Sequence, residues 1–276
     1  MKRSGKIIIV GLFLVVGLIG YSEGAEAMGK NIQVPSYTLK DYLNRRLTID
    51  YIPEEDQDIE KDKSYGGVPE YLFNQDFDVF EPRLTGYESS SLEGLQQVRT
   101  KKLVLQGQPY DLNPITNIYE LEELDLKIVS GQGYGGRART GSSDLSFMKD
   151  GFPNLKVLTY TLNGSYDGIN ALLDVSELSE HPNLERVTIK SEGGLQPASM
   201  KKGYRKYELF DPVILSDQFA GADITYSSTD ATFSNVGNLL KWTTIPEKTE
   251  YLNLSWLVEK GDFRFEGDVQ IPIDWK

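Results

Sequence analysis

The sequence predicts an α/β leucine-rich repeat solenoid of about four coils, followed by an all-β sandwich and preceded by an N-terminal cap region. Three observations predict this fold class. A segment that begins with aspartate recurs in the middle of the chain, each copy ends on alternating aliphatic residues, and the last part alternates at period two between turn residues. The expected boundaries are 28–97 for the cap region with an insertion, 98–195 for the repeats and 204–276 for the sandwich.

The repeats are recognised by how they open and how they end. Three copies open with Asp, an aliphatic residue and Asn or Ser, at Asp111, Asp144 and Asp174. A further copy precedes them, and the equivalent strand positions are Leu103, Leu124, Leu158 and Val187. Each coil is too thin to bury its own apolar edge, so stacking is expected. The glycine-rich stretch 130–143 and the stretch 163–173 are expected to be inserted loops.

A stack of this kind presents one row of strand side chains on a concave face. Because side chains alternate along a strand, the outward positions can be identified from the buried ones. The candidate partner-binding residues are Lys102, Val104, Gln106, Glu123, Asp125, Lys127, Val157, Thr159, Thr161, Arg186, Thr188 and Lys190. Simple solvation of each position is the alternative.

The repeats resemble those of the internalin family, secreted and wall-bound leucine-rich repeat proteins. The segment DLNPITNIYELEELDL follows the family pattern nearly position for position, and DVSELSEHPNLERVTI differs mainly by Glu177 where proline is usual. The resemblance continues in Trp242, in the alternation from Leu252 to Val258, and in the closing FRFEGDVQIPI. It implies an immunoglobulin-like adjacent domain at 204–276. The region 28–97 departs from the family, with a charge run and an aromatic-rich stretch at 65–87.

The N-terminus is typical of a cleavable secretory signal at residues 1–27. Three basic residues precede an apolar run from Ile7 to Ile19, which is too short to span a bilayer comfortably. Ala25-Glu26-Ala27 supplies the cleavage site, so the mature chain is expected to start near Met28. An uncleaved anchor is the alternative. No sorting motif follows Val269, so release into the surroundings is expected.

The charge and the cysteine content limit the kinds of binding partner and of cellular compartment that are expected. The chain carries 29 basic and 41 acidic residues, a net charge of −12. Such a field repels nucleic acid and anionic membranes, so neither is expected to bind after signal cleavage. The chain has no cysteine, so burial alone must hold the exported fold together. That absence also fits a Gram-positive secretor.

Catalysis has few routes in this sequence. The one histidine, His181, is expected to be an exposed structural residue on the outer segment of a coil. The acidic run at 54–62 lacks the glycine and glutamate of an EF-hand, which favours a solvated loop and leaves weak calcium binding as the alternative. The glycines at 131–136 do not form a nucleotide loop. No catalytic residue, metal or cofactor is therefore expected, although carboxylate pairs for glycoside hydrolysis stay open.

These observations predict a secreted, non-enzymatic, monomeric protein that recognises a host or cell-surface protein through the concave face. Two alternatives remain. One is a structural or carbohydrate-binding envelope component whose ligand site is the aromatic-rich stretch 65–87. The other is a hydrolase with an acidic pair.

Overall fold

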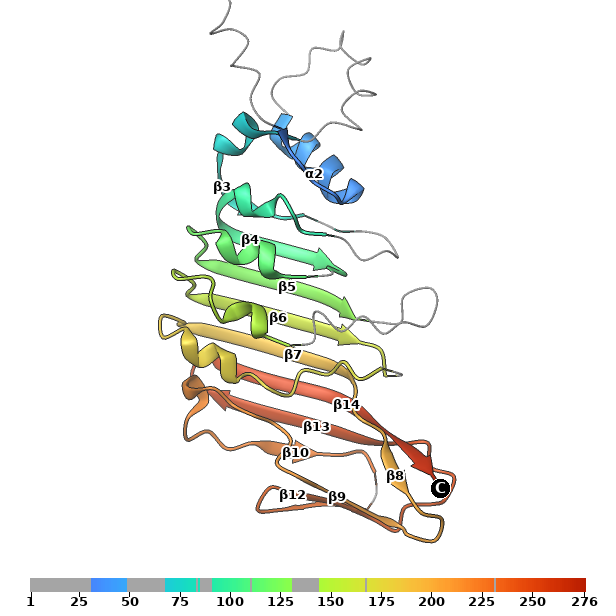
Figure 1. The fold of residues 1–276 in the computed structure, drawn as a ribbon. Coiled ribbons are helices and arrows are strands. Elements are labelled where there is room, and N and C mark those ends of the chain that lie inside the picture. Colours follow the sequence, from blue (N-terminus) through green and yellow to red (C-terminus); the bar gives the residue numbers. More distant parts are fainter. Residues whose placement is uncertain are drawn as a thin grey trace, which may run out of the picture.

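The computed structural model describes residues 31–48, 68–82, 84, 91–109, 111–130, 144–166, 168–230 and 232–276. The expected signal segment, the acidic run at 54–62 and residues 131–143 of the glycine-rich stretch lie outside these residues. The described chain is an elongated stack of strands, with α2 at one end and a small C-terminal sheet at the other (Figure 1). No helix in the described part is long and apolar enough to cross a membrane.

Parallel strands in register form the middle of the stack. They are β3 (Asp76–Phe80), β4 (Arg99–Gly107), β5 (Glu123–Ser130), β6 (Val157–Gly164) and β7 (Arg186–Gly194). The aligned positions of the repeats pair directly across β4 to β7, so Leu103, Leu124, Leu158 and Val187 lie in one buried row. The repeat alignment therefore corresponds to the register of the strands.

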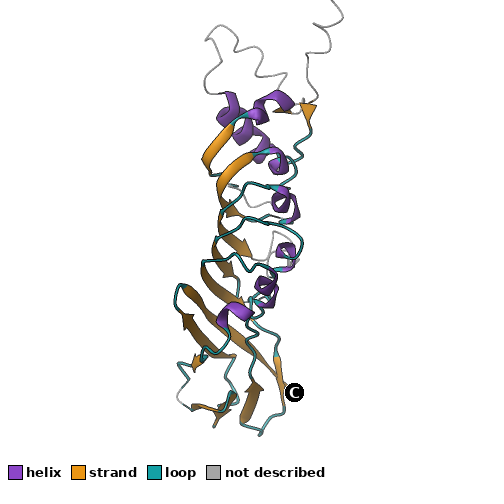
Figure 2. Cartoon of the chain, turned by 90° about the vertical axis from the view of Figure 1, so that its left-hand side faces the viewer, coloured by secondary structure: helices purple, strands orange, loops and turns teal. Residues whose placement is uncertain are grey.

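Short 3-10 turns return the chain between these strands. They are η3 (Leu95–Gln97), η4 (Asn113–Asn117), η5 (Ser146–Met148) and η6 (Ser176–Glu180). The aspartate that opens each repeat accepts a hydrogen bond from the backbone N–H two residues later, at 2.9 Å for Asp111, 3.0 Å for Asp144 and 2.9 Å for Asp174. The turns form a column along one face of the sheet (Figure 2).

The predicted fold class is wrong. Strands make up 44% of the structure and helices 15%, and the described residues contain a single α-helix, so this is a mostly β protein with mixed sheets and not an α/β leucine-rich repeat solenoid. The physical reason lies in the returning segments. Their three to five helical residues form 3-10 turns opened by the aspartate bonds, too few for an α-helix.

The C-terminal part continues the same sheet, which also contradicts a separate all-β immunoglobulin-like sandwich. Strand β14 (Phe263–Trp275) pairs parallel with β7, and β13 (Tyr251–Lys260) pairs antiparallel with β14. Strand β10 (Thr225–Ser227) borders β13, and β8 (Ala198–Met200) pairs with the end of β14. One nine-stranded mixed sheet results. The turn η7 (Asp217–Phe219) also packs against η6, where Gln218 Nε2 donates to the Leu178 carbonyl at 2.7 Å.

A second sheet of three strands closes the C-terminal end. It contains β11 (Phe233–Val236), β12 (Leu239–Thr243) and β9 (Lys206–Phe210), in the order β11-β12-β9. Trp242 of β12 is fully buried, and its Nε1 donates to Ser228 Oγ at 3.2 Å. The loop that holds Ser228 is tied to β13, because Asp230 Oδ2 accepts from the Asn253 backbone at 2.9 Å. These bonds join the two sheets around one indole ring.

The N-terminal end is covered by the one described α-helix. Strand β1 (Asn31–Ile32) pairs with β2 (Val68–Pro69), and α2 (Tyr37–Thr48) and η2 (Glu70–Asn74) pack beside them. Leu39 and Leu43 are fully buried under α2. A helix here covers the apolar edge that the first strands would otherwise expose.

Candidate binding surface

The sheet has one covered face and one open face. The 3-10 column covers the first, and among the described residues no element lies over the second (Figure 2). All twelve predicted outward residues lie on this open face in three rows that cross β4 to β7. The rows are Lys102-Glu123-Val157-Arg186, Val104-Asp125-Thr159-Thr188 and Gln106-Lys127-Thr161-Lys190.

The open face is wider than the repeats alone predicted. Strand β14 sets Arg264 beside Thr188, Glu266 beside Lys190 and Asp268 beside Glu192. Strand β13 follows, with Glu259 opposite Arg264. Sequence reasoning missed these residues because β14 comes from the end of the chain. The alternation in FRFEGDVQI was visible, but it does not say which strand is its partner.

Charges on the open face are arranged in pairs. Lys102 Nζ lies 2.9 Å from Glu123 Oε2, and Lys190 Nζ lies 2.7 Å from Glu192 Oε1. Five basic side chains face six acidic ones: Lys102, Lys127, Arg186, Lys190 and Arg264 against Glu123, Asp125, Glu192, Glu259, Glu266 and Asp268. The face is therefore nearly neutral, although the whole chain carries −12.

Two further features describe the electrostatics of this face. The hydrogen bond and charge of Glu192 raise the pKa of Lys190, so its ammonium group stays charged well into the alkaline range. Asp125 Oδ1 is buried without a hydrogen-bond partner, while its other oxygen lies 3.6 Å from Lys127 Nζ. A buried acceptor without a partner costs free energy.

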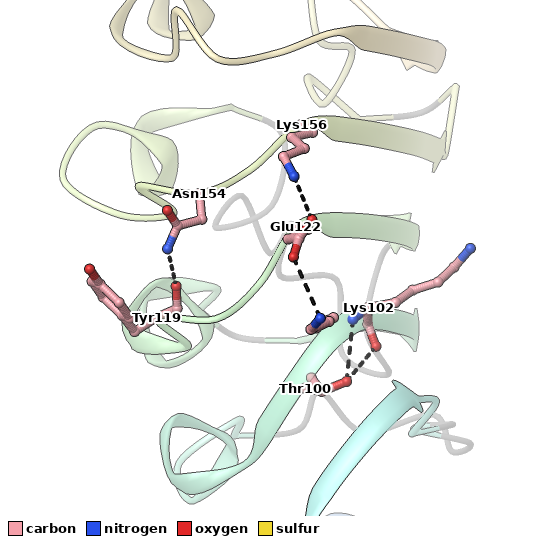
Figure 3. Close-up of polar contacts among 7 residues, drawn as sticks. Thr100, Lys102, Tyr119, Glu122, Asn154 and Lys156 are labelled. Atoms are coloured by element: carbon pink, nitrogen blue, oxygen red, sulfur yellow. Dashed lines mark hydrogen bonds and ion pairs between the residues drawn. The ribbon is translucent and has the colours of Figure 1, made fainter.

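A second polar feature lies at the rim where the strands begin. Lys101, Glu122, Lys156 and Glu185 occupy equivalent positions with alternating charge, and backbone N–H groups of Glu122, Lys156 and Glu185 each bond to the carbonyl of the preceding member at 2.8 Å. Figure 3 shows the Glu122 carboxylate pointing toward Lys156. Lys156 Nζ lies 2.6 Å from Glu122 Oε2. This hydrogen bond and the charge of Lys156 lower the pKa of Glu122, and the same bond with the charge of Glu122 raises the pKa of Lys156.

An asparagine ladder runs parallel to these charges. Asn154 Nδ2 donates to the Tyr119 carbonyl at 2.8 Å, as Figure 3 shows, and Asn183 Nδ2 donates to the Pro153 carbonyl at 3.4 Å. Both asparagines lie in a Pro-Asn-Leu triplet that recurs in the sequence. The recurrence could have been found from the sequence, because a polar residue repeated at the same offset suggests a structural bond. Between the charges and the asparagines lies a hollow of about 580 Å³.

The prediction for His181 is wrong. Its side chain is buried, and Nε2 lies 2.7 Å from the Met148 carbonyl oxygen of the preceding repeat. His181 lies three residues before the aligned Leu184. In an earlier repeat, the buried Ile118 lies three residues before Leu121, so the two side chains occupy equivalent positions. A polar residue in that slot can be buried because its hydrogen bond is satisfied.

Two other sequence features, the acidic side chains and the aromatic-rich stretch 65–87, form no metal or ligand site among the described residues. The described part of the chain contains no group of three or more His, Cys, Asp or Glu side chains that could hold a metal ion. In the aromatic-rich stretch 65–87, the described Phe73 and Phe80 are buried in the core and Phe77 packs against it. These rings stabilise the fold and do not form a ligand platform.

The two solved structures described below have low sequence identity to this chain. No family model and no curated protein matches it. Among solved structures, it is similar to the functional domain of InlJ from Listeria monocytogenes, at 11% identity and a TM-score of 0.36, covering 74% of this chain and 49% of that one. It is also similar to the CBM51-2 and INT domains of ZmpB from Clostridium perfringens, solved with GlcNAc, at 11% identity and a TM-score of 0.29, covering 89% of this chain and 36% of that one.

These likenesses define no family. Both TM-scores are below 0.5, so neither carries an argument about this chain, which spans about half the length of the first structure and about a third of the second. The class that the fold and its surface define is a mostly β protein with a long, uncovered, mixed-charge sheet face.

Proposed function

We propose that this chain is an exported binding protein whose open face recognises a protein on a host or cell surface. One observation supports the proposal above all: rows of exposed side chains in register cross β4, β5, β6, β7 and β14 on a face that no described element covers, while 3-10 turns cover the opposite face. A broad, regular surface of this kind suits binding by many small contacts.

The charge pattern favours a protein partner of mixed charge. Because the basic side chains of the face lie beside acidic ones, a partner must exchange these ion pairs for its own. A protein surface offers both signs of charge, whereas nucleic acid offers only one. The net −12 of the chain adds a long-range attraction for basic partners. We propose no catalytic role, and a monomer as the binding unit.

The proposal is tested by removing four charges from the open face at once. The variant replaces Glu123, Asp125, Lys127 and Arg186 with alanine, which leaves the net charge unchanged. The matched control replaces Lys149, Asp150, Glu180 and Lys201, four exposed residues outside the face with the same balance of charge. Host-cell surface proteins and bacterial wall extracts are applied to immobilised wild type and both variants.

A partner that binds wild type and control but is lost from the face variant is the expected result. A partner that the face variant retains at full affinity contradicts the proposal. Export is tested separately, by N-terminal sequencing of the protein from the culture medium. The first residue is expected near Met28, and finding the protein only in the cell fraction contradicts release.

A further inference from the structure

The rim at the start of the strands contains a groove that the open face does not use. The hollow of about 580 Å³ is bounded on one side by Lys101, Glu122, Lys156 and Glu185, and on the other by Glu120, Asn154 and Asn183. A second hollow of about 360 Å³ adjoins it at Glu120 and is lined also by Gln96, Gln97, Asn117 and Tyr119. The two hollows are together called the rim groove.

An exposed aromatic ring, Tyr119, lines the second hollow next to Glu120, which both hollows share. Tyr119 is 72% exposed. Figure 3 shows the ring projecting from the same turn that accepts the Asn154 hydrogen bond. The backbone at Tyr119 is therefore tied to the next repeat while the ring itself is available to a ligand.

The groove is lined with groups that bind hydroxyls. Asn154 and Asn183 each use one amide hydrogen in the ladder, and an amide has a second hydrogen and an acceptor oxygen. The carboxylates of Glu120 and Glu122 accept hydrogen bonds, and Lys156 donates them. Two apolar residues, the exposed Pro182 and the buried Leu184, complete the lining.

The spacing of the groups also selects a ligand. Equivalent side chains recur once per strand, about 4.8 Å apart, and four strands span about 14 Å. A pyranose unit in an extended chain has about the length of one strand spacing. An extended peptide advances only about 3.4 Å per residue. A repeating sugar can therefore keep step with the polar groups of successive strands, while a peptide falls out of register.

We propose that the rim groove binds a neutral, linear oligosaccharide, with one sugar ring stacked on Tyr119 and its hydroxyls bonded to Asn154, Glu122 and Lys156. A neutral chain fits because the groove charges are already paired with one another, as in Glu122 with Lys156. An anionic polysaccharide would meet the strongly negative field of the chain. The inference does not depend on the protein partner of the open face.

The test is titration of the full chain with β-1,4-linked glucose oligomers and with their N-acetylated counterparts, from disaccharide to hexasaccharide, by calorimetry. We expect affinity to rise with length up to three or four units and then level off, because the groove ends. Tyr119→Ala is expected to weaken binding by about tenfold or more. Tyr204→Ala, a 62% exposed tyrosine in the C-terminal part, is the matched control and leaves affinity unchanged.

Several outcomes overturn the proposal. They are no binding of either series at millimolar concentration, binding that Tyr119→Ala leaves unchanged, or binding of a neutral glycine-serine peptide of matched length in preference to the sugars. The four-alanine open-face variant separates the two proposals. It must keep oligosaccharide affinity at the wild-type value, and loss of sugar binding in that variant would place the sugar on the open face instead.

Discussion

Three of the four repeats begin with an aspartate whose Oδ1 accepts a hydrogen bond from the backbone two residues later, which opens the 3-10 turn. The first repeat has Ser91 in this position, and its Oγ accepts from the Glu93 N–H at 3.2 Å. The motif that made the repeats visible is thus a local structural device. The same kind of hydrogen bond recurs in the repeats because it shapes the turn, so ligand binding is not needed to explain the motif.

Asp174→Ala is expected to lower the free energy of unfolding by about 1 kcal/mol, as for loss of a helix cap. Asp174→Asn keeps an acceptor oxygen and should retain most of the stability. Urea unfolding of both variants measures the difference. Equal losses in the two variants would show that the side-chain hydrogen bond is not what stabilises the turn.

His181→Leu is expected to destabilise the fold by about 1–3 kcal/mol, because the buried Met148 carbonyl loses its donor even though leucine suits the apolar slot. The exposed neighbour gives the control, since Glu180→Leu should change stability by less than about 0.5 kcal/mol. Thermal unfolding followed by circular dichroism distinguishes them. A variant as stable as wild type would mean that the hydrogen bond contributes nothing net.

At the scale of elements, packing between neighbouring strands is close enough to restrict residue size. Gly267 of β14 lies against the indole of Trp256 on β13, and a Cβ at this position would overlap that ring. Trp256 in turn packs edge-to-face on Phe265, with ring centroids 5.5 Å apart. The glycine is therefore required by contact and not by backbone conformation.

Gly267→Ala is expected to cost about 1–3 kcal/mol through overpacking. Trp256→Phe removes the atoms that would overlap, so the same glycine change should cost less in that background. A double-mutant cycle by urea unfolding measures this coupling. Strictly additive losses would contradict the contact.

The rim charges predict a dependence on pH. Lys156 lowers the pKa of Glu122 below its ordinary value of 4.5, so the contribution of Glu122 to stability is present above that value and is lost as pH falls through the lowered pKa. The stability difference between wild type and Glu122→Gln should therefore be present at neutral pH and vanish in acid. It should also shrink in high salt, because the pair is exposed. A difference that is constant with pH would refute this.

In the molecule as a whole, β14 joins the repeats and the C-terminal part into one structural unit. It fills the place beside β7 where a further repeat strand would lie, and η7 continues the column of turns after η6. Two segments from outside the repeats thus cover the last repeat edge, which would otherwise expose unpaired backbone groups.

This continuity predicts a single unfolding transition. Trp242, Trp256 and Trp275 all lie in the C-terminal part, so their fluorescence reports on it, whereas far-ultraviolet circular dichroism reports on all strands. The two signals should coincide in a urea titration. Separate midpoints would indicate two independent units. Truncation before Phe263 should abolish the shared transition, because β7 and β13 both lose a partner.

The local pattern of this protein can be predicted from its sequence. The positions of the aspartates, the buried row through Leu124 and the outward row through Asp125 follow from period-two alternation and from a recurring offset, both of which are properties of neighbouring residues. Three other features could be seen only in the folded chain: the returns are 3-10 turns, His181 is buried, and Arg264 and Glu266 join the open face. These outcomes depend on which segments pack together across long intervals of chain. Pairing of this kind is set by the whole core, and a strand's own residues do not specify it.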